Sequence, residues 1–317
     1  METTVNCQHF ASVIGQSTAI KLLKASINSK RLPNAFLFAG LDGVGKRLAA
    51  KCLIQALLMP AQESVDIAEL SSNKHPDILW VMPTYQQLDK RLTETAAIAH
   101  GINRKTAPVI RISQVRELVE FAATQPIIAA QKVVVIEAAD SLNHQAASAL
   151  LKILESPLNT LFILLTSRIQ EVLPTIVSRC QLIPFRRLSD DDFARVLNQA
   201  GEQQILDNPM LLKMAQGSPG AAISYYQMLQ SIPEEVLQQC TNLPSNLRAA
   251  LSLAKTIDHS LEHSQQLWLI DYLQFLWWHS YHRIELIEKL AQAKDALLKL
   301  AQNRLVWEVT LANTIAS

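Results

Sequence analysis

The amino-acid sequence predicts a parallel α/β domain with helices flanking its sheet, followed by a small helical domain and an all-α C-terminal domain. Three apolar runs of strand length, at 35–40, 132–140 and 160–167, alternate with helical segments, which is typical of a doubly wound parallel sheet. After Phe185, nearly every segment carries apolar residues at helical spacing, and none alternates as a strand does.

Each element has its own local signal. The run AFLFAG leads through a Gly-rich turn, LDGVGK, into the helix-like run RLAAKCLIQALL. The run KVVVIEAAD is β-branched and has nothing polar between Lys132 and Glu137, as expected of a central strand covered on both faces. The run TLFILLTS follows a helical segment, HQAASALLKILESP, that should end at Pro157. Residues 61–107 are polar and weakly periodic, so we expect a surface excursion there.

The second half of the chain reads as helices with clear ends. The segment DDDFARVLNQA opens with acidic residues suited to a helix N-terminus, and NPMLLKMAQGSPG closes on Gly217 and Pro219. We therefore divide the chain into domains at 1–183, 184–228 and 229–317.

The charge balance bears on nucleic-acid binding. Lys and Arg number 29 against 28 Asp and Glu, so the 317-residue chain lacks the basic excess that drives binding to a phosphate backbone. Any contact with DNA should therefore be local or made by partners.

The cysteines and the apolar segments indicate a cytoplasmic protein. The four cysteines lie far apart without a C-x-x-C pair, which favours buried thiols in a reduced compartment. The N-terminus has neither a basic start nor an apolar stretch typical of an export signal. The richest apolar stretch, 267–278, is interrupted by Asp271 and Gln274 and is shorter than the roughly 20 residues of a membrane span.

A phosphate-binding loop stands between the first strand and its helix. Residues 40–46 fit the first seven positions of the P-loop pattern G-x-x-x-x-G-K-[ST]. The glycines let backbone N–H groups surround a phosphate, and the lysine neutralises it. The eighth position is Arg47, whose guanidinium cannot ligate Mg²⁺ as a hydroxyl does. The residues of this degenerate P-loop and candidate anion site are Gly40, Gly43, Gly45, Lys46 and Arg47.

The end of the second strand also departs from a hydrolytic site. An acidic pair is needed there, one carboxylate for Mg²⁺ and one to orient the attacking water, and the chain has Glu137 followed by Ala138. Asp140 lies two residues further along and is no substitute. Thr166, after the third strand, either acts as a polar sensor or satisfies a backbone group at the strand end.

The C-terminal aromatics and histidines leave alternatives open. Tryptophans at helical spacing are either core residues or an interface between subunits. His279 and His282 have metal-ligand spacing but lack a third ligand, which favours an ordinary structural role. The tryptophans concerned are Trp268, Trp277, Trp278 and Trp307.

Several short motifs occur in a specific order along the chain. They are Ile14-Gly15-Gln16, His75-Pro76-Asp77, IRISQVREL at 110–118, SALLKILESP at 148–157, LPTIVSRC at 173–180 and GSPGAA at 217–222. With the degenerate P-loop, they make the chain resemble the delta-prime family of bacterial DNA polymerase III clamp loaders, a degenerate AAA+ family. The resemblance weakens after Ala222, and its most specific part is Ser178-Arg179-Cys180.

This resemblance implies an AAA+ domain, a helical lid and a helical collar that assembles a ring with the other loader subunits. ATP with Mg²⁺ then sits on a neighbouring subunit, and Arg179, with Ser178 and Cys180 as its motif, reaches the γ-phosphate as an arginine finger. The chain would have no cofactor and no independent activity of its own. It would meet the sliding clamp and primer-template DNA through the assembled complex.

Two further family features are missing. ATP-hydrolysing members carry a lid arginine where this chain has Gly220, and many relatives bind zinc through four cysteines. No cysteine occurs between Cys52 and Cys180, and His75 alone cannot hold zinc, so we predict no zinc or other metal.

Two other functions compete with this reading. One is an active ATPase motor subunit of the same loader, which Arg47, Ala138 and Gly220 disfavour. The other is an AAA+ protein that binds DNA directly, which the near-zero net charge disfavours.

Overall fold

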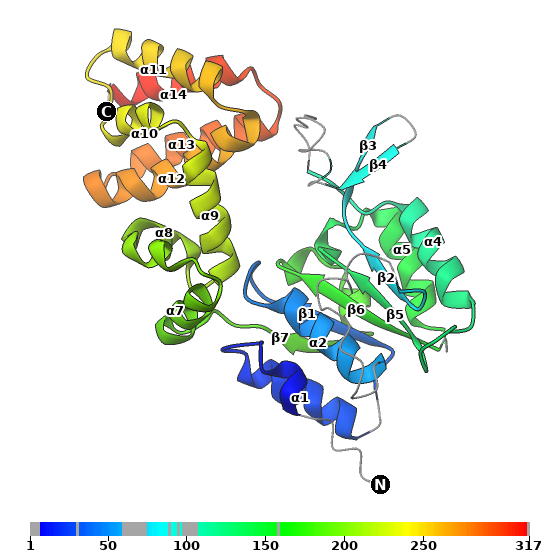
Figure 1. The fold of residues 1–317 in the computed structure, drawn as a ribbon. Helices are drawn as coiled ribbons and strands as arrows, with labels where there is room; N and C mark the ends of the chain where they lie inside the picture. The colour runs from blue at the N-terminus through cyan, green and yellow to red at the C-terminus, as the bar shows by residue number, and fades with distance from the viewer. Residues whose placement is uncertain are drawn as a thin grey trace. The chain divides into compact units, whose positions relative to one another are not determined.

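The computed structural model describes residues 7–29, 32–58, 75–87, 90–93, 96, 107–156 and 159–315 (Figure 1). These residues form two compact units. The first unit holds the described residues of 1–96, 108–201 and 217–221, and the second holds those of 97–107, 202–216 and 222–317. The finer division into three domains stays a prediction.

The first unit is built on a parallel sheet whose order, in the described residues, is β2-β5-β6-β1-β7. Every neighbouring pair in it is parallel, so the carboxyl ends of all its strands lie along one edge. The strands are β1 (Ala35–Ala39), β2 (Ile78–Val81), β5 (Lys132–Ile136), β6 (Thr160–Thr166) and β7 (Gln181–Pro184).

Helices cover both faces of this sheet, which explains why its central strands are apolar throughout. On one face, side chains from three strands, among them Leu37, Val134 and Leu164, pack against α4 (Ile112–Ala123) and α5 (His144–Leu154). The opposite face is covered by α1 (Ser17–Asn28) and α2 (Lys46–Leu58), which contact β7 and β6. The three strands and the doubly wound arrangement predicted from the sequence are confirmed.

The expectation of a surface excursion over 61–107 is wrong for part of that range. Residues 78–81 form β2, an edge strand of the main sheet in which Ile78, Trp80 and Val81 are buried. The run ILWV lies between Pro76 and Pro83 and is too short to show periodicity. Nearby, β3 (Thr84–Gln87) and β4 (Lys90–Thr93) form an antiparallel pair. Most of the excursion, like Pro157, lies outside the described residues.

Short elements complete the first unit. The helix α7 matches the acidic segment predicted to start a helix, and the side chain of Ser189 caps its N-terminus. The elements are η1 (Cys7–Phe10), η3 (Ala139–Ser141), η4 (Ile169–Glu171), α6 (Pro174–Val177) and α7 (Asp190–Gln199).

Asp77 of the His-Pro-Asp motif anchors the turn that leads into β5. Its carboxylate is fully buried and accepts backbone N–H bonds from Ile127, Ile128 and Ala129, at 2.7, 2.7 and 2.8 Å. Burial of Asp77 opposes ionisation, but the three N–H donors outweigh it and lower the pKa of the carboxyl. The motif is therefore structural, because it fixes the position of a central strand.

The second unit is helical in all its described elements. They are η5 (Gln203–Asp207), α8 (Pro209–Ala215), most of α9 (Pro219–Ser231), α10 (Glu234–Thr241), α11 (Leu247–Ser260), α12 (His263–Tyr281), α13 (Ile284–Leu298) and α14 (Asn303–Ile315). Across the described residues, no helix combines the length and apolar character that crossing a membrane requires.

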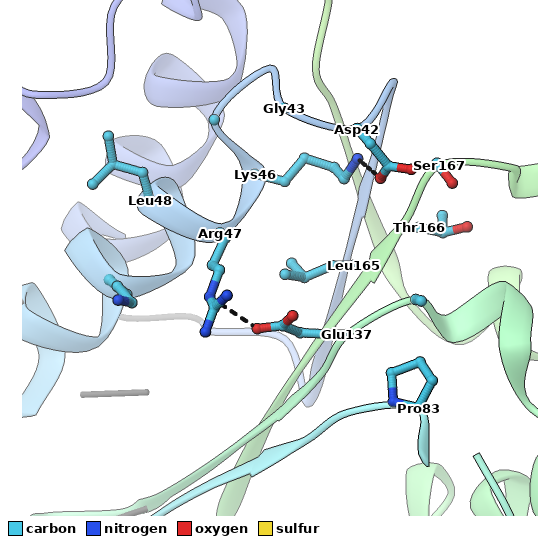
Figure 2. A pocket seen from close by; sticks show the side chains of 13 residues that line it. Asp42, Gly43, Lys46, Arg47, Leu48, Pro83, Glu137, Leu165, Thr166 and Ser167 are labelled. Carbon is cyan, nitrogen blue, oxygen red and sulfur yellow. Dashed lines mark hydrogen bonds and ion pairs between the residues drawn. The ribbon is translucent and has the colours of Figure 1, made fainter. Parts of the chain in front are cut away.

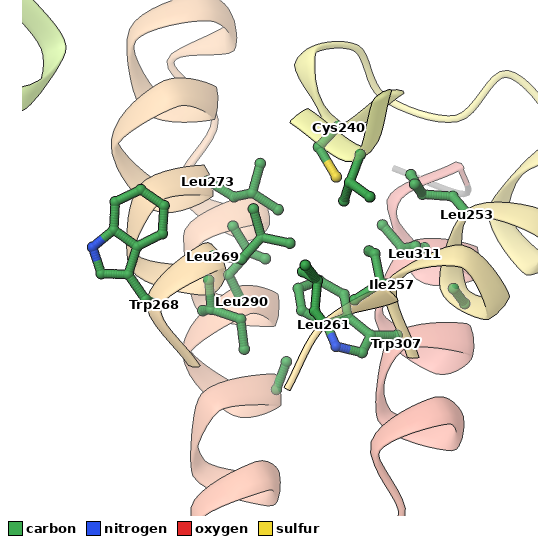
Figure 3. Packing of buried hydrophobic residues seen from close by; sticks show 14 of the residues in the cluster. Cys240, Leu253, Ile257, Leu261, Trp268, Leu269, Leu273, Leu290, Trp307 and Leu311 are labelled. Atoms are coloured by element: carbon green, nitrogen blue, oxygen red, sulfur yellow. The ribbon is translucent and has the colours of Figure 1, made fainter. Parts of the chain in front are cut away.

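Tryptophans pack among mainly aliphatic side chains in the core of the second unit (Figure 3). Trp277 and Trp307 are fully buried and donate their Nε1–H groups to the Cys240 carbonyl and the Gln266 side chain, both at 3.0 Å. Trp268 is also buried, whereas Trp278 is 44% exposed. The core interpretation is therefore confirmed for three of the four tryptophans and is wrong for Trp278.

Three cysteines, Cys52, Cys180 and Cys240, are free thiols. Cys52 and Cys240 are buried, and Cys180 is half-buried. Burial raises the pKa of all three thiols, to about 12 for Cys180 and Cys240. They behave as small apolar side chains rather than as nucleophiles.

We predict that Asp77→Asn lowers the free energy of unfolding at pH 7 by about 1–3 kcal/mol, because a backbone donor loses its acceptor. The folded-state pKa of Asp77 is lowered, so its stabilisation is present above the unfolded pKa, about 3.9, and is lost as the pH falls below it. Urea unfolding at pH 7 and at lower pH measures both effects. The exposed Asp207→Asn variant is the control, and an equal loss in both variants contradicts the anchoring role.

Candidate functional site

The carboxyl ends of β1, β5 and β6 meet at a cavity of about 590 Å³ (Figure 2). The predicted P-loop lines it from β1, Glu137 and Ala138 line it from β5, and Thr166 lines it from β6. The order of the strands thus brings together the residues that the sequence analysis had singled out separately.

The P-loop places its lysine inside its own turn. Gly43 and Gly45 have φ of 76° and 102°, a left-handed conformation that glycine adopts without strain. The Lys46 Nζ donates to the carbonyls of Gly40 at 2.5 Å and Leu41 at 2.7 Å, and lies 3.3 Å from Asp42 Oδ1. Burial lowers the pKa of Lys46, and the Asp42 charge opposes that shift. The lysine is therefore already engaged by loop oxygens.

Arg47 fills the place where a hydroxyl would ligate Mg²⁺. Its Nε lies 3.0 Å from Glu137 Oε1, a charge contact rather than an aligned hydrogen bond (Figure 2). Its guanidinium also lies over the Trp80 ring, 5.5 Å from the centroid. Burial raises the pKa of Glu137, and the charges of Arg47 and Lys51 oppose that shift. The carboxylate that could hold a metal is therefore paired with a fixed cation.

The residues beyond Glu137 are engaged elsewhere. Ala138 is left-handed, with φ of 49°, and presents no polar group. The Asp140 carboxylate accepts from the Thr166 hydroxyl at 2.7 Å and from Arg168 Nη2 at 3.0 Å. Asp140 thus anchors the end of β6. The Thr166 hydroxyl oxygen also accepts the Arg168 backbone N–H at 3.2 Å, so this side chain satisfies a backbone group at the strand end.

The start of α9 packs directly on the P-loop. The Gly220 N–H donates to the Gly43 carbonyl at 3.1 Å, and the Ser218 hydroxyl donates to the Asp42 carbonyl at 2.5 Å. A Cβ at position 220 would lie 2.6 Å from Gly43 Cα, closer than real Cβ contacts allow. The place that corresponds to the lid arginine is thus filled by backbone, and only glycine fits it.

Gln16 of the Ile-Gly-Gln motif holds the other side of the loop. Its buried side-chain amide donates to the Val44 carbonyl at 3.2 Å and to the Arg186 carbonyl at 2.7 Å. Its oxygen accepts the Arg186 N–H at 3.0 Å. This side chain ties the P-loop to the segment that follows β7.

Arg179 lies apart from the cavity, because it follows α6 and does not line the pocket. Its Nη1 donates to the Thr175 carbonyl at 3.0 Å, and its Nη2 lies 2.5 Å from Glu155 Oε1. The Ser178 hydroxyl donates to the same carbonyl at 3.1 Å, while Cys180 is half-buried beside it. The Arg179 side chain is 38% exposed.

Two contacts were not foreseen from the sequence. Arg47 and Glu137 are separate departures from the hydrolytic pattern in the sequence, yet they pair with each other in the structure. Glu155 was read only as part of a helical motif, although it contacts the candidate finger. Both pairs join segments far apart in the chain, so local pattern gave no signal for them.

The cavity suits an anion better than a metal-bound nucleotide. A positive helix N-terminus, Lys46, Arg47 and Lys51 line it, which favours a phosphate group. Arg47 beside Glu137 is unsuited to Mg²⁺, because a cation cannot ligate a cation. Among the described residues, no group of three or more His, Cys, Asp or Glu side chains could hold a metal ion.

Two family models match consecutive parts of the chain. The model described as "DNA polymerase III, delta subunit" matches residues 15–189, which is more than half of the chain. The model described as "Cyanobacterial DNA polymerase III delta prime, C-terminal domain" matches residues 191–314. The chain belongs to the DNA polymerase III delta-prime family. The resemblance stated from the motifs is therefore confirmed.

Curated relatives agree with this membership. The chain is 32% identical over 180 residues to the DNA polymerase III subunit delta′ of Bacillus subtilis, covering 55% of this chain and 48% of that protein. It is 29% identical over 228 residues to the gamma/tau subunit of Mycoplasma genitalium, covering 71% of this chain and 35% of that protein. The chain thus spans about half or less of the length of these relatives.

A solved structure supports the fold. The gamma subunit-related protein of Thermotoga maritima superposes with a TM-score of 0.54 at 17% identity, covering 94% of this chain and 99% of that one. The predicted fold class, a parallel sheet with flanking helices of the AAA+ kind followed by an all-helical region, is confirmed.

We predict that Gly220→Ala lowers the free energy of unfolding by about 1–3 kcal/mol, the usual cost of overpacking. A Cβ would overlap the P-loop backbone, and this outweighs the helix propensity that alanine gains, about 1 kcal/mol. Urea unfolding measures the loss. Ser224→Ala, an exposed position of the same helix, serves as the control. Equal or greater stability of Gly220→Ala would contradict the close backbone contact.

Proposed function

We propose that this delta-prime family member is a non-hydrolysing clamp-loader subunit that lends Arg179 to the ATP site of a neighbouring subunit. The ion pair between Arg47 and Glu137, at 3.0 Å, is the observation that carries the proposal. It puts a permanent positive charge where a hydrolysing subunit would hold Mg²⁺.

Other residues of the chain's own site also argue against ATP hydrolysis. Phosphoryl transfer needs a metal ion to neutralise the phosphates and a group to orient the attacking water. Ala138 has no such group, and the backbone contact at Gly220 excludes a lid arginine. A loop that binds a phosphate without turning ATP over fits these features, so the anion site stays part of the proposal.

Arg179 has the properties that an arginine finger requires. An arginine is always charged, and its planar fork can bind phosphate oxygens through two N–H groups at once. The side chain is partly exposed, and its backbone is fixed by the hydrogen bonds that end α6. This placement supports donation to another subunit, because the residue lies outside the chain's own cavity.

The helical unit supports assembly with other loader subunits. Exposed apolar residues gather on its last two helices, where α13 and α14 border a second cavity of about 270 Å³. Apolar side chains of this size at a surface are typical of protein interfaces. Contacts with the sliding clamp and primer-template DNA would then be made through the complex. The exposed residues on these two helices are Ile284, Leu298, Leu305, Val309 and Ile315.

An ATPase motor remains the main competing function. The cavity of about 590 Å³ and Lys46 at the start of α2 favour it. The Arg47–Glu137 pair and Ala138 outweigh them, since both the metal and the water lack a group to hold them.

We predict that Arg179→Ala lowers the DNA- and clamp-stimulated ATPase of the reconstituted loader by about 10³-fold at one subunit boundary, the lower end for a lost arginine finger. The subunit should still fold and assemble, because an exposed ion pair contributes little to stability. Steady-state ATPase at saturating ATP measures the loss of rate, and size-exclusion analysis of the complex measures assembly. If the ATP sites at other subunit boundaries work independently, the total ATPase rate falls only by the fraction that this one site contributes.

Two variants sharpen the test. Arg179→Lys should rescue poorly, because an ammonium group lacks the bidentate fork. Lys46→Ala in the same subunit should leave the stimulated ATPase near the wild-type rate. A Lys46→Ala variant as damaging as Arg179→Ala would overturn the division between an inactive own site and a donated finger.

A further inference from the structure

We infer that Glu155 holds the Arg179 guanidinium in a parked position until a phosphate of the neighbouring subunit displaces it. This inference rests on the proposed finger role of Arg179. It adds a positioning residue that sets how readily the finger becomes available, and it assigns that role to Glu155, the C-cap residue of α5.

The parked position is built by two segments that the fold brings together. Glu155 is the C-cap residue of α5, and its N–H is bound to the Leu151 and Ile153 carbonyls. Arg179 follows α6, a helix that contacts α5. The Glu155 carboxylate lies 2.5 Å from Arg179 Nη2, and the Thr175 carbonyl accepts from Nη1. Both terminal nitrogens of the guanidinium are therefore held from its own domain.

Phosphate and carboxylate compete for the same fork. A carboxylate binds a guanidinium through the N–H groups that would also contact phosphate oxygens. While Glu155 is paired with it, the charge that Arg179 offers to a neighbour is largely neutralised. The finger can stabilise a γ-phosphate fully only when the carboxylate has been displaced.

The ion pair between Arg179 and Glu155 is weak enough for a phosphate to replace the carboxylate. The side chains are 38% and 54% exposed, and pairs of this kind are worth about 0.2–1 kcal/mol. A triphosphate carries more negative charge than one carboxylate, so it can displace Glu155 at modest cost. Buried pairs resist separation far more strongly, and would not serve as a temporary position.

Removing the carboxylate should therefore favour the engaged finger. If the ion pair contributes about 0.2–1 kcal/mol, its loss corresponds, through RT, to a roughly 1.4- to 5-fold lower KM for ATP at that boundary. The kcat should not change, because the finger reaches the same engaged state once ATP is bound. A merely structural role for Glu155 would not produce this split between KM and kcat.

The test compares Glu155→Gln and Glu155→Asp in the reconstituted loader, with ATP concentration varied in the presence of clamp and primed DNA. We expect Glu155→Gln to lower the KM by about 1.4- to 5-fold at unchanged kcat. Glu155→Asp keeps the charge and should stay close to the wild type. The matched control is Glu171→Gln, which removes an exposed carboxylate from Arg168, its partner at 2.7 Å.

The outcomes separate this inference from the proposed function. An unchanged KM for Glu155→Gln, with Arg179→Ala still impaired, overturns the parking role alone. A fall in kcat for Glu155→Gln also overturns it, because Glu155 would then orient the finger during the reaction. A wild-type ATPase for Arg179→Ala overturns both. In an Arg179→Ala background, the effect of Glu155→Gln should vanish, and a persistent effect would show that it does not act through the finger.

Discussion

The ion pair of Arg47 with Glu137 fixes what the α/β unit can do with its phosphate-binding loop. The guanidinium comes from the first turn of α2 and the carboxylate from the end of β5, so the pair ties the two central elements of the site together. A metal ion at this place would have to displace a charge that is covalently part of the chain. We therefore propose that the site keeps the shape of a nucleotide pocket without the means to bind Mg²⁺.

The polar groups packed around the P-loop are also bound to other groups of the chain. Lys46 is satisfied by carbonyls of its own loop, and Gly220 meets Gly43 backbone to backbone. Ser218 and Gln16 add hydrogen bonds from either side. These groups therefore bind one another around the loop. Under the proposed function, the chemistry offered to a partner is carried by Arg179, which lies outside this cavity.

Much of the fold could be predicted from the sequence, because long apolar runs such as 132–136 and 160–166 have an unambiguous pattern. The strand at 78–81 could not, since four residues between two prolines show no period. The residues of the P-loop were found from local spacing, and the Ser-Arg-Cys motif from the resemblance to the clamp-loader family. The partners Glu137 for Arg47 and Glu155 for Arg179 were not, because each pair is formed by tertiary packing.

Titration of the isolated chain with ATP, with and without Mg²⁺, shows whether the Arg47–Glu137 pair excludes the metal ion. We expect Mg²⁺ not to strengthen any nucleotide binding, because Arg47 occupies the cation's place beside Glu137. We also expect no phosphate to be released above background. Binding that tightens with Mg²⁺, together with turnover of about 1–100 s⁻¹ that Lys46→Ala abolishes, would contradict both expectations.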